Sequence, residues 1–264
     1  MKAPKTLFLA WQDSQSRCWF PIGRITFDEG KYEFVYTRGV IEAEKFGFAP
    51  LLSFPYLKGV YTSTYLFPVL ANRLMPRSRP DYADFVQWLN ISQHDDDPIA
   101  ILARSGGQRK TDTLTVFPSP EPDEDGKYHI HFFLHGLRHL PKCSIERINS
   151  FKPEEKLWLA HEFQNPYDSQ ALVLNTDDHY IVGYCPRFLN CEVFELLHQN
   201  PNAVEVRVER VNQSPAPLQF RLLCNLTAQW DKKFRPFSSL EYQPYDFPVG
   251  DALATLGRSL HRKQ

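Results

Sequence analysis

Hydrophobic residues recur with two different periods along the chain, and the two halves use these periods differently. In the first half, runs rich in β-branched and aromatic residues predict strands at residues 6–11, 17–26, 31–36 and 113–117. Apolar residues spaced three and four positions apart predict helices at residues 66–74, 82–89 and 98–105. The first half is therefore predicted to be a small β-sheet with helices.

The last of these helices has recognisable signals at both ends. Asp97 precedes Pro98, which suits a first helical turn, and Gly106-Gly107 favours helix termination. The same glycines lie in a run, residues 104–111, that superficially resembles a phosphate-binding loop. A Walker motif needs glycine immediately before its lysine, and its loop follows a strand. Helix termination is therefore the favoured interpretation of these glycines.

The second half consists of short predicted strands interrupted by one helix. Val204, Val206 and Val208 alternate with charged residues, which is typical of a strand with one solvated face. The strands are expected at residues 128–135, 156–162, 170–175, 180–184, 204–211 and 220–228. The helix is expected to start near Pro186 and to stop at Asn200-Pro201. This pattern predicts a small, partly open β-barrel and assigns the chain to the α+β class.

A proline-rich and acidic segment separates the two halves. Residues 119–126 read Ser-Pro-Glu-Pro-Asp-Glu-Asp-Gly, a composition that favours an exposed, extended connector. The expected organisation is a first domain at residues 1–118, a linker at 119–127, a barrel at 128–230 and a C-terminal tail at 231–264.

The charge balance limits the kind of nucleic-acid site that the chain can carry. Its 264 residues include 30 basic and 31 acidic side chains, and the predicted barrel itself carries 9 basic and 11 acidic ones. A protein that follows a long stretch of nucleic-acid backbone needs a basic excess, because its affinity comes from neutralising many phosphates. A site in this barrel is therefore expected to be compact and to have a shallow salt dependence.

Several classes of protein are disfavoured by missing signals. The five cysteines form no Cys-x-x-Cys pair, so free thiols are expected rather than disulfides or a cysteine zinc site. No apolar run reaches the length of a secretion signal or a membrane span, so we expect a cytoplasmic protein with no membrane partner. The common hydrolase, zinc-protease and dinucleotide motifs are absent, so neither an enzyme nor a cofactor is expected.

Two further groups, one of histidines and one of arginines, are candidate binding sites. His129, His131 and His135 alternate along one predicted strand, but no acidic or cysteine residue stands at a recurrent ligand spacing, so no metal site is expected. Arg73, Arg77 and Arg79 lie in a stretch without acidic residues. This cluster is either a nucleic-acid contact or a solvated helix end that favours cations.

Three separated motifs in the second half resemble those of the HIRAN domain. These motifs are Gly136-Leu137-Arg138-His139, the loop from Glu162 to Asp168 that contains Asn165-Pro166-Tyr167-Asp168, and the step from Gly183-Tyr184 to Arg187. The resemblance covers roughly residues 128–230. It implies a modified oligonucleotide-binding (OB-like) barrel that binds the 3′ end of single-stranded DNA. Histidine stands at position 139 where helicase members of the family carry tyrosine.

The resemblance implies that Arg138, His139, Asn165, Tyr167, Asp168, Tyr184 and Arg187 form the nucleic-acid site. The chemistry of these residues is compatible with this role, because a tyrosine face can stack a base and an arginine can bind phosphate oxygens. An ionised Asp168 would accept a hydrogen bond from a 3′-hydroxyl and repel a 3′-phosphate. The alternative is that Asn165 and Asp168 only cap a tight loop while Tyr167 packs in the core.

The first half resembles the small N-terminal subdomain of HipA-type proteins, the kinase toxins of bacterial toxin–antitoxin systems. The matching residues are the strands near Trp11 and Trp19, Phe46-Gly-Phe-Ala-Pro50, and Phe67 to Pro76, over residues 5–118. No kinase follows them. The resemblance implies a scaffold or regulatory module that docks a protein partner, such as a helicase, a nuclease or a kinase-like protein.

The sequence thus favours a non-enzymatic protein that recognises a free 3′ end of single-stranded DNA and couples this recognition to a protein partner. The rival is a protein-interaction subunit, for example a toxin–antitoxin-like regulator or a DNA-repair or phage-defence accessory, without intrinsic DNA binding. A nuclease ranks third.

Overall fold

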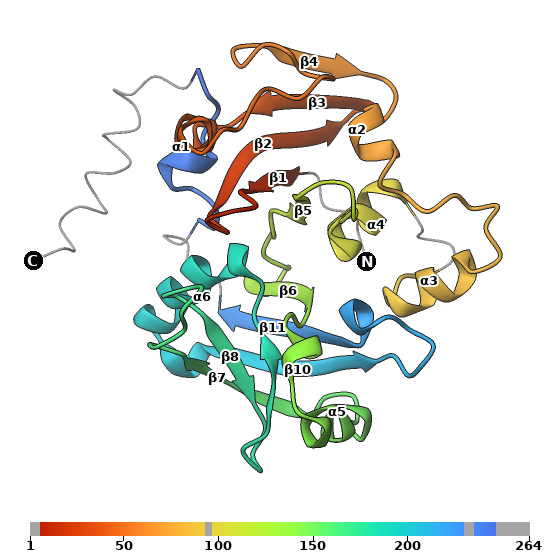
Figure 1. The fold of residues 1–264 in the computed structure, drawn as a ribbon, viewed down its shortest axis with the longest axis vertical. Helices are drawn as coiled ribbons and strands as arrows, with labels where there is room; N and C mark the ends of the chain where they lie inside the picture. The colour runs from red at the N-terminus through yellow and green to blue at the C-terminus, as the bar shows by residue number, and fades with distance from the viewer. Residues whose placement is uncertain (1–5, 93–96, 230–234, 247–264) are drawn as a thin grey trace, which may run out of the picture. The chain divides into compact units, whose positions relative to one another are not determined.

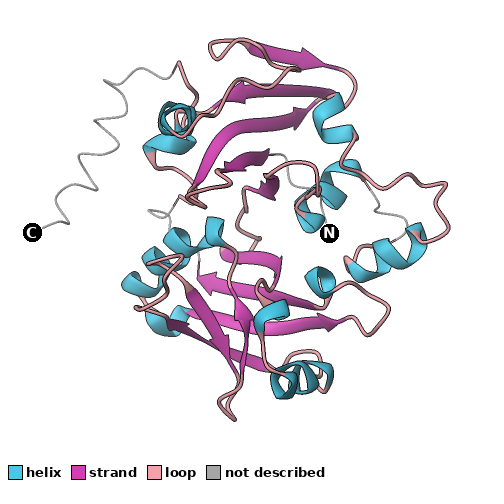
Figure 2. Cartoon of the chain, viewed as in Figure 1, coloured by secondary structure: helices cyan, strands magenta, loops and turns pink. Residues whose placement is uncertain are grey.

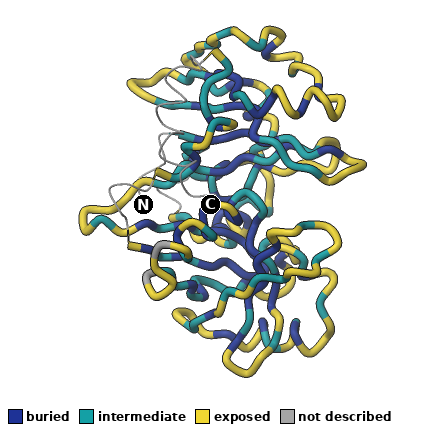
Figure 3. The backbone as a smooth tube through the Cα atoms, turned by 90° about the vertical axis from the view of Figure 1, so that its left-hand side faces the viewer, coloured by how far each residue is buried: buried dark blue, intermediate teal, exposed yellow. Residues whose placement is uncertain are grey.

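The computed structural model describes residues 6–92, 97–229 and 235–246, and these residues form two compact units (Figure 1). The first unit contains residues 6–79, 97–119 and 235–246, and the second contains residues 80–92 and 120–229. Strands run through the core of each unit, and the exposed residues gather in the turns and loops (Figure 3). In the described residues, no helix is long and apolar enough to cross a bilayer.

The first unit is an antiparallel sheet with helices, as predicted. Its strands lie in the order β4-β3-β2-β1-β5. They are β1 (Thr6–Gln12), β2 (Trp19–Asp28), β3 (Lys31–Tyr36), β4 (Val60–Ser63) and β5 (Leu114–Pro118). The helices are α1 (Gly39–Lys45), α2 (Pro68–Ala71) and α4 (Pro98–Ser105). The core includes Leu9, Ile22 and Phe34, which are fully buried.

The predicted ends of α4 are confirmed. The Asp97 carboxylate accepts hydrogen bonds from the backbone N–H groups of Ile99 and Ala100, and Gly106 ends the helix in the left-handed conformation, with φ of 74°. The loop that resembles a phosphate-binding loop is therefore a helix end in this structure.

Residues 235–246 pack into the first unit, although the sequence placed them in a C-terminal tail. Phe237 and Tyr242 form an aromatic cluster with Phe8 and Phe117, with ring centroids 5.1–6.5 Å apart. Two backbone hydrogen bonds, from Arg38 N to Gln243 O and from Tyr245 N to Tyr36 O, fix this segment beside the sheet. Burial of these aromatic rings against Phe8 and Phe117 explains why the chain returns to the first unit after the barrel. Residues 247–264 of the predicted tail lie outside the described residues.

The second unit is a curled, six-stranded antiparallel sheet (Figure 2). Its strand order is β6-β11-β10-β7-β8-β9. The strands are β6 (Lys127–Phe133), β7 (Lys156–His161), β8 (Leu172–Asn175), β9 (Ile181–Tyr184), β10 (Val204–Val211) and β11 (Leu222–Gln229). All six correspond to predicted strands. Helix α6 (Arg187–Gln199) follows β9 and buries Leu189, Val193 and Leu196, as the sequence pattern predicted.

Two helices of this unit differ from the prediction. Helix α5 (Lys142–Asn149) was not predicted, because it buries few apolar residues, chiefly Ile148, and so carries little periodicity. Helix α3 (Tyr82–Trp88) was placed in the first domain by its position in the sequence. It belongs to the second unit, where the Phe85 ring packs edge-on against Phe220 at 5.7 Å and Asn212 Nδ2 donates to Trp88 O at 2.9 Å.

Two reciprocal backbone hydrogen bonds join the edges of the six-stranded sheet. His135, just after β6, donates to Tyr184 O at 2.9 Å, and Tyr184, at the end of β9, donates to His135 O at 3.0 Å. This isolated bridge connects the first and last strands in the sheet order, so the sheet is a partly open barrel. Gly183 makes the closure possible: a Cβ at this position would lie 2.9 Å from His135 O and 3.0 Å from Leu134 Cβ.

Replacing Gly183 by alanine is therefore expected to destabilise the protein by about 2–4 kcal/mol, because it adds a steric clash to an unfavourable positive φ. The matched control is Gly126→Ala, where φ is also positive but the nearest atom is 3.9 Å from the added Cβ. The control should lose only about 1 kcal/mol. Urea unfolding of both variants gives the comparison, and equal losses would contradict the role assigned to Gly183.

Candidate nucleic-acid interface

The barrel closure brings the first and third sequence motifs together. Tyr184 packs directly on Gly136, where an added Cβ would lie 2.8 Å from Tyr184 Cδ2. Gly136 has φ of 79° and begins the short 3-10 turn η1 (Leu137–His139). Leu137 is buried, whereas Arg138 and His139 are exposed. The bridge and this glycine contact thus place the two exposed side chains beside the end of β9.

The Asn165 side chain holds the loop between β7 and β8 together by hydrogen bonds within the loop. Its Oδ1 accepts hydrogen bonds from the backbone N–H groups of Tyr167 at 2.9 Å and Asp168 at 3.0 Å. Its Nδ2 donates to Glu162 Oε2 at 2.6 Å. All of its side-chain polar atoms therefore serve the loop, which is the capping role that the sequence left open for this residue.

Asp168 ties this loop to the start of α6. Arg187 Nε lies 3.0 Å from Asp168 Oδ2, and Asn190 Nδ2 donates to the same oxygen at 3.2 Å. The other oxygen, Oδ1, accepts from Gln170 N at 3.0 Å. Arg187 also donates through Nη2 to Tyr167 O. Asp168 and Arg187, which the sequence predicted as separate nucleic-acid contacts, thus form a partly buried ion pair next to Tyr167.

Glu162 connects the loop to β9. Its carboxylate accepts a hydrogen bond from Asn165 Nδ2 and lies near the Tyr184 phenol. Burial, followed by this contact with the carboxylate, raises the pKa of the Tyr184 phenol above its usual value. Hydrogen bonds run from the Glu162 carboxylate through the Asn165 side chain to the backbone N–H of Asp168.

The groups that face solvent at this site are aromatic and basic. Tyr167 is 78% exposed, so the alternative that it packs in the core is wrong. Arg138 and His139 are also exposed, and Arg138 Nε donates to His139 Nε2 at 2.9 Å. The structure therefore brings all seven predicted residues to one end of the barrel. Tyr167, Arg138 and His139 face outward, and Asn165, Asp168, Tyr184 and Arg187 support them.

Three residues of this region were not predicted as part of the site. Glu162 begins the second motif, but a sequence pattern does not reveal that its carboxylate accepts a hydrogen bond from Asn165. Phe163 is 81% exposed, with its ring centroid 4.1 Å from that of His161. His135, weighed in the sequence only as a metal ligand, is exposed and pairs with Tyr184. An aromatic residue directly after a strand was the one available signal for Phe163.

The other groups weighed in the sequence have different partners. His129 contacts Asp123 at 2.9 Å and His131 contacts Glu209 at 2.5 Å, and the described residues hold no group of three His, Cys, Asp or Glu side chains suited to a metal. Arg73 is 2% exposed and binds Asp112 Oδ2 and Gly107 O at 2.7 and 2.8 Å. Arg73 therefore holds the first unit together and is not a surface contact for nucleic acid.

Comparisons with known proteins identify the second unit. Residues 127–231 match the family model of the HIRAN domain. No curated protein matches the chain. Among solved structures, a protein from Lactobacillus plantarum is 20% identical, covering 39% of this chain and 97% of that one, with a TM-score of 0.31. The HIRAN domain of human HLTF is also 20% identical, covering 46% of this chain and 90% of that one, with a TM-score of 0.31.

The chain thus contains a HIRAN domain at residues 127–231, as its three motifs predicted. This assignment supports nucleic-acid binding in general for the second unit. The family match does not extend to residues 1–126, so the resemblance of the first half to the HipA N-terminal subdomain stays a prediction.

Asn165→Ala is expected to lower the free energy of unfolding by about 1–3 kcal/mol, because two backbone N–H groups lose their acceptor. Tyr167→Ala is the matched control from the same loop. Its side chain is exposed, so its effect on stability should stay within about 0.5 kcal/mol. Chemical denaturation measures both, and an Asn165→Ala variant as stable as the control would show that the loop does not depend on this side chain.

Proposed function

We propose that the HIRAN domain of this chain binds single-stranded DNA by its free 3′-hydroxyl end. In this proposal the exposed Tyr167 stacks on a terminal base, which contributes roughly 1–3 kcal/mol without reading the identity of the base. Arg138 binds a phosphate by charge-assisted hydrogen bonds, and His139 and His135 line the same end of the barrel. Asp168 accepts the hydrogen bond of the 3′-hydroxyl.

The environment of Asp168 is the observation that carries this proposal. Its side chain is 20% exposed and directly follows Tyr167, so it is accessible from the stacking position. A carboxylate offers about four lone-pair sites. Three donors use them here: Arg187 Nε and Asn190 Nδ2 on Oδ2, and Gln170 N on Oδ1. The remaining site on Oδ1 suits one further donor, such as a hydroxyl group.

The same arrangement disfavours a phosphorylated end. Arg187 is already paired with Asp168, so the pair as a whole offers little net positive charge to a phosphate. A phosphate that approaches Oδ1 meets a like charge and brings no hydrogen to donate. At an effective dielectric constant of about 20, two such charges 4 Å apart repel each other by about 4 kcal/mol before screening.

We further propose that the chain is a cytoplasmic binding protein rather than an enzyme, and that the first unit docks a protein partner. The HipA-like motifs of the sequence favour this role. Exposed apolar side chains near the edge strand β4 also support it, since large apolar groups on a surface often mark interaction sites. They are Leu52, Tyr56, Val60 and Tyr65.

The test compares the affinity of the full chain for 5′-labelled single strands that end in a 3′-hydroxyl or a 3′-phosphate. The wild-type protein is expected to prefer the hydroxyl at least tenfold, a difference of about 1.4 kcal/mol. Asp168→Asn should bring this ratio close to one, because it removes both the charge and the best acceptor.

Asp178→Asn is the matched control, because Asp178 also pairs with an arginine, Arg147 Nε at 3.0 Å, but on another part of the unit. It should keep the wild-type ratio. Equal wild-type affinity for the two ends would refute end recognition, and an unchanged ratio in Asp168→Asn would refute the role of this carboxylate.

A further inference from the structure

A second cavity opens on the same unit, at the opposite end of the β7–β8 pair. It has a volume of about 500 Å³ and is lined by Trp158, Asn175, Thr176, Asp177 and His179. Pockets of 300–1,000 Å³ are typical of small-ligand sites. Trp158 is 48% exposed, which leaves indole surface available to a ligand.

The chemistry of this cavity suits a nucleobase better than a phosphate. The indole provides an aromatic face, and the Asn175 amide offers both a donor and an acceptor to a base edge. The Asp177 carboxylate accepts from Trp158 Nε1 at 2.5 Å and would repel a phosphate within the cavity. Lys156 Nζ lies over the indole ring, 4.0 Å from its centroid, and 4.0 Å from Glu205 Oε1, so a base would stack on the opposite face of the indole.

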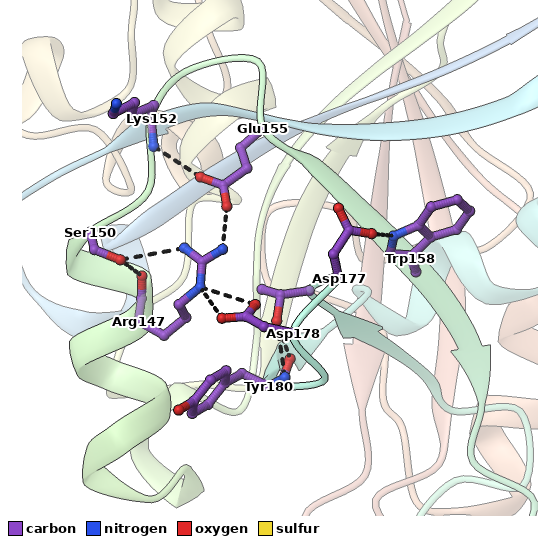
Figure 4. Close-up of polar contacts among 9 residues, drawn as sticks. Arg147, Ser150, Lys152, Glu155, Trp158, Asp177, Asp178 and Tyr180 are labelled. Atoms are coloured by element: carbon purple, nitrogen blue, oxygen red, sulfur yellow. Dashed lines mark hydrogen bonds and ion pairs between the residues drawn. The ribbon is translucent and has the colours of Figure 1, made fainter.

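The turn that carries the cavity is firmly held. Asp178 points toward Arg147 of α5, while Asp177 points the other way, toward Trp158 (Figure 4). Arg147 binds Asp178 through Nε at 3.0 and 3.2 Å and binds Glu155 through Nη2. Thr176 Oγ1 accepts from Tyr180 N at 2.9 Å across the turn. The cavity wall is therefore ordered before a ligand arrives, which lowers the entropic cost of binding.

Strand register places the Trp158 side chain on the same face of the sheet as Ala160 and Tyr184, toward the sheet end that carries the 3′-end site. Trp158 pairs with Asn175, which pairs with Ile181, and two residues further along β7, Ala160 pairs with Val173, which pairs with Tyr184. Paired residues of antiparallel strands share a face. The two rows are about 7 Å apart at 3.4 Å per residue. Ala160, in the second row, is exposed and too small to block a strand that crosses from one row to the other.

We propose that the Trp158 cavity binds the base of the third nucleotide from the 3′ end. This inference rests on the proposed function, because the terminal nucleotide must occupy the site of Tyr167 and Asp168. From the loop of Tyr167 the strand must first reach the row of Ala160 and then cross about 7 Å to the row of Trp158, so we assign one intervening nucleotide to this path. The HIRAN domain then holds three nucleotides by two aromatic contacts, and Lys156 lies on the side of Trp158 away from Ala160, where the strand leaves the cavity.

The experiment measures the affinity of the full chain for 3′-hydroxyl oligothymidylates of two and eight nucleotides. Trp158→Ala should bind the octanucleotide roughly 5- to 150-fold more weakly than wild type and the dinucleotide equally well. Trp158→Phe keeps an aromatic face and should lose less. Tyr65→Ala, which removes an exposed aromatic side chain from the first unit, is the control and should leave both affinities unchanged.

An abasic site at the third position from the 3′ end separates direct stacking from a structural effect. It should weaken binding by wild type to a similar degree and have little further effect in Trp158→Ala. If Trp158→Ala binds both lengths as wild type does, or weakens both equally, the cavity proposal is overturned while end recognition stands. If wild type shows no preference for a 3′-hydroxyl but Trp158→Ala still weakens the octanucleotide, end recognition fails and the cavity proposal stands. Absence of binding to either oligonucleotide refutes both.

Discussion

Two backbone hydrogen bonds between His135 and Tyr184 join the edge strands of the six-stranded sheet, and the candidate site depends on them. They require close approach of two chain segments, which explains glycine on each side of the contact, at Gly136 and Gly183. Without this bridge, Arg138 and His139 would not lie beside β9. The closure thus converts motifs about 50 residues apart in sequence into neighbours in space.

The polar network behind the site contributes order and selectivity more than attraction. The polar side chains of this network bind one another and the loop backbone: Asn165 binds Glu162 and Tyr167 N, and Asp168 pairs with Arg187. This leaves few free positive charges toward solvent, in agreement with the slight acidic excess of the barrel. In the proposed function, such a site would gain its affinity from stacking and from one or two phosphate contacts, and its carboxylate would discriminate between the chemistries of the strand end.

Much of the local structure was predictable from the sequence. All six barrel strands, helix α6 and the capped helix α4 follow from periodicity and from residues such as Asp97 and Gly106. The return of residues 235–246 and the placement of α3 were not predictable. They depend on the tertiary contacts of Phe237 with Phe8 and of Phe85 with Phe220. Neither secondary-structure propensity nor position in the sequence predicts such contacts.

For the candidate site as well, the sequence predicted the local motifs but not the tertiary roles of their residues. Its seven residues were identified through their resemblance to a family motif, but their roles could not be assigned without coordinates. Tyr167 and Asn165 lie two positions apart, yet one faces solvent and the other holds the loop together. The sequence does not single out Trp158 as a binding residue, because a tryptophan on a strand is usually a core residue. Its exposure becomes visible only when the neighbouring strands are in register.

Photo-crosslinking tests the central claim, that the barrel closure gathers three motifs into one end-binding site, most directly. A single strand with 4-thiothymidine at its 3′-terminal position is bound to the full chain and irradiated, and the crosslinked peptides are identified by mass spectrometry. The account predicts crosslinks within residues 136–139, 163–168 and 184–187. Crosslinks confined to the first unit, or to parts of the barrel distant from these three motifs, would contradict it.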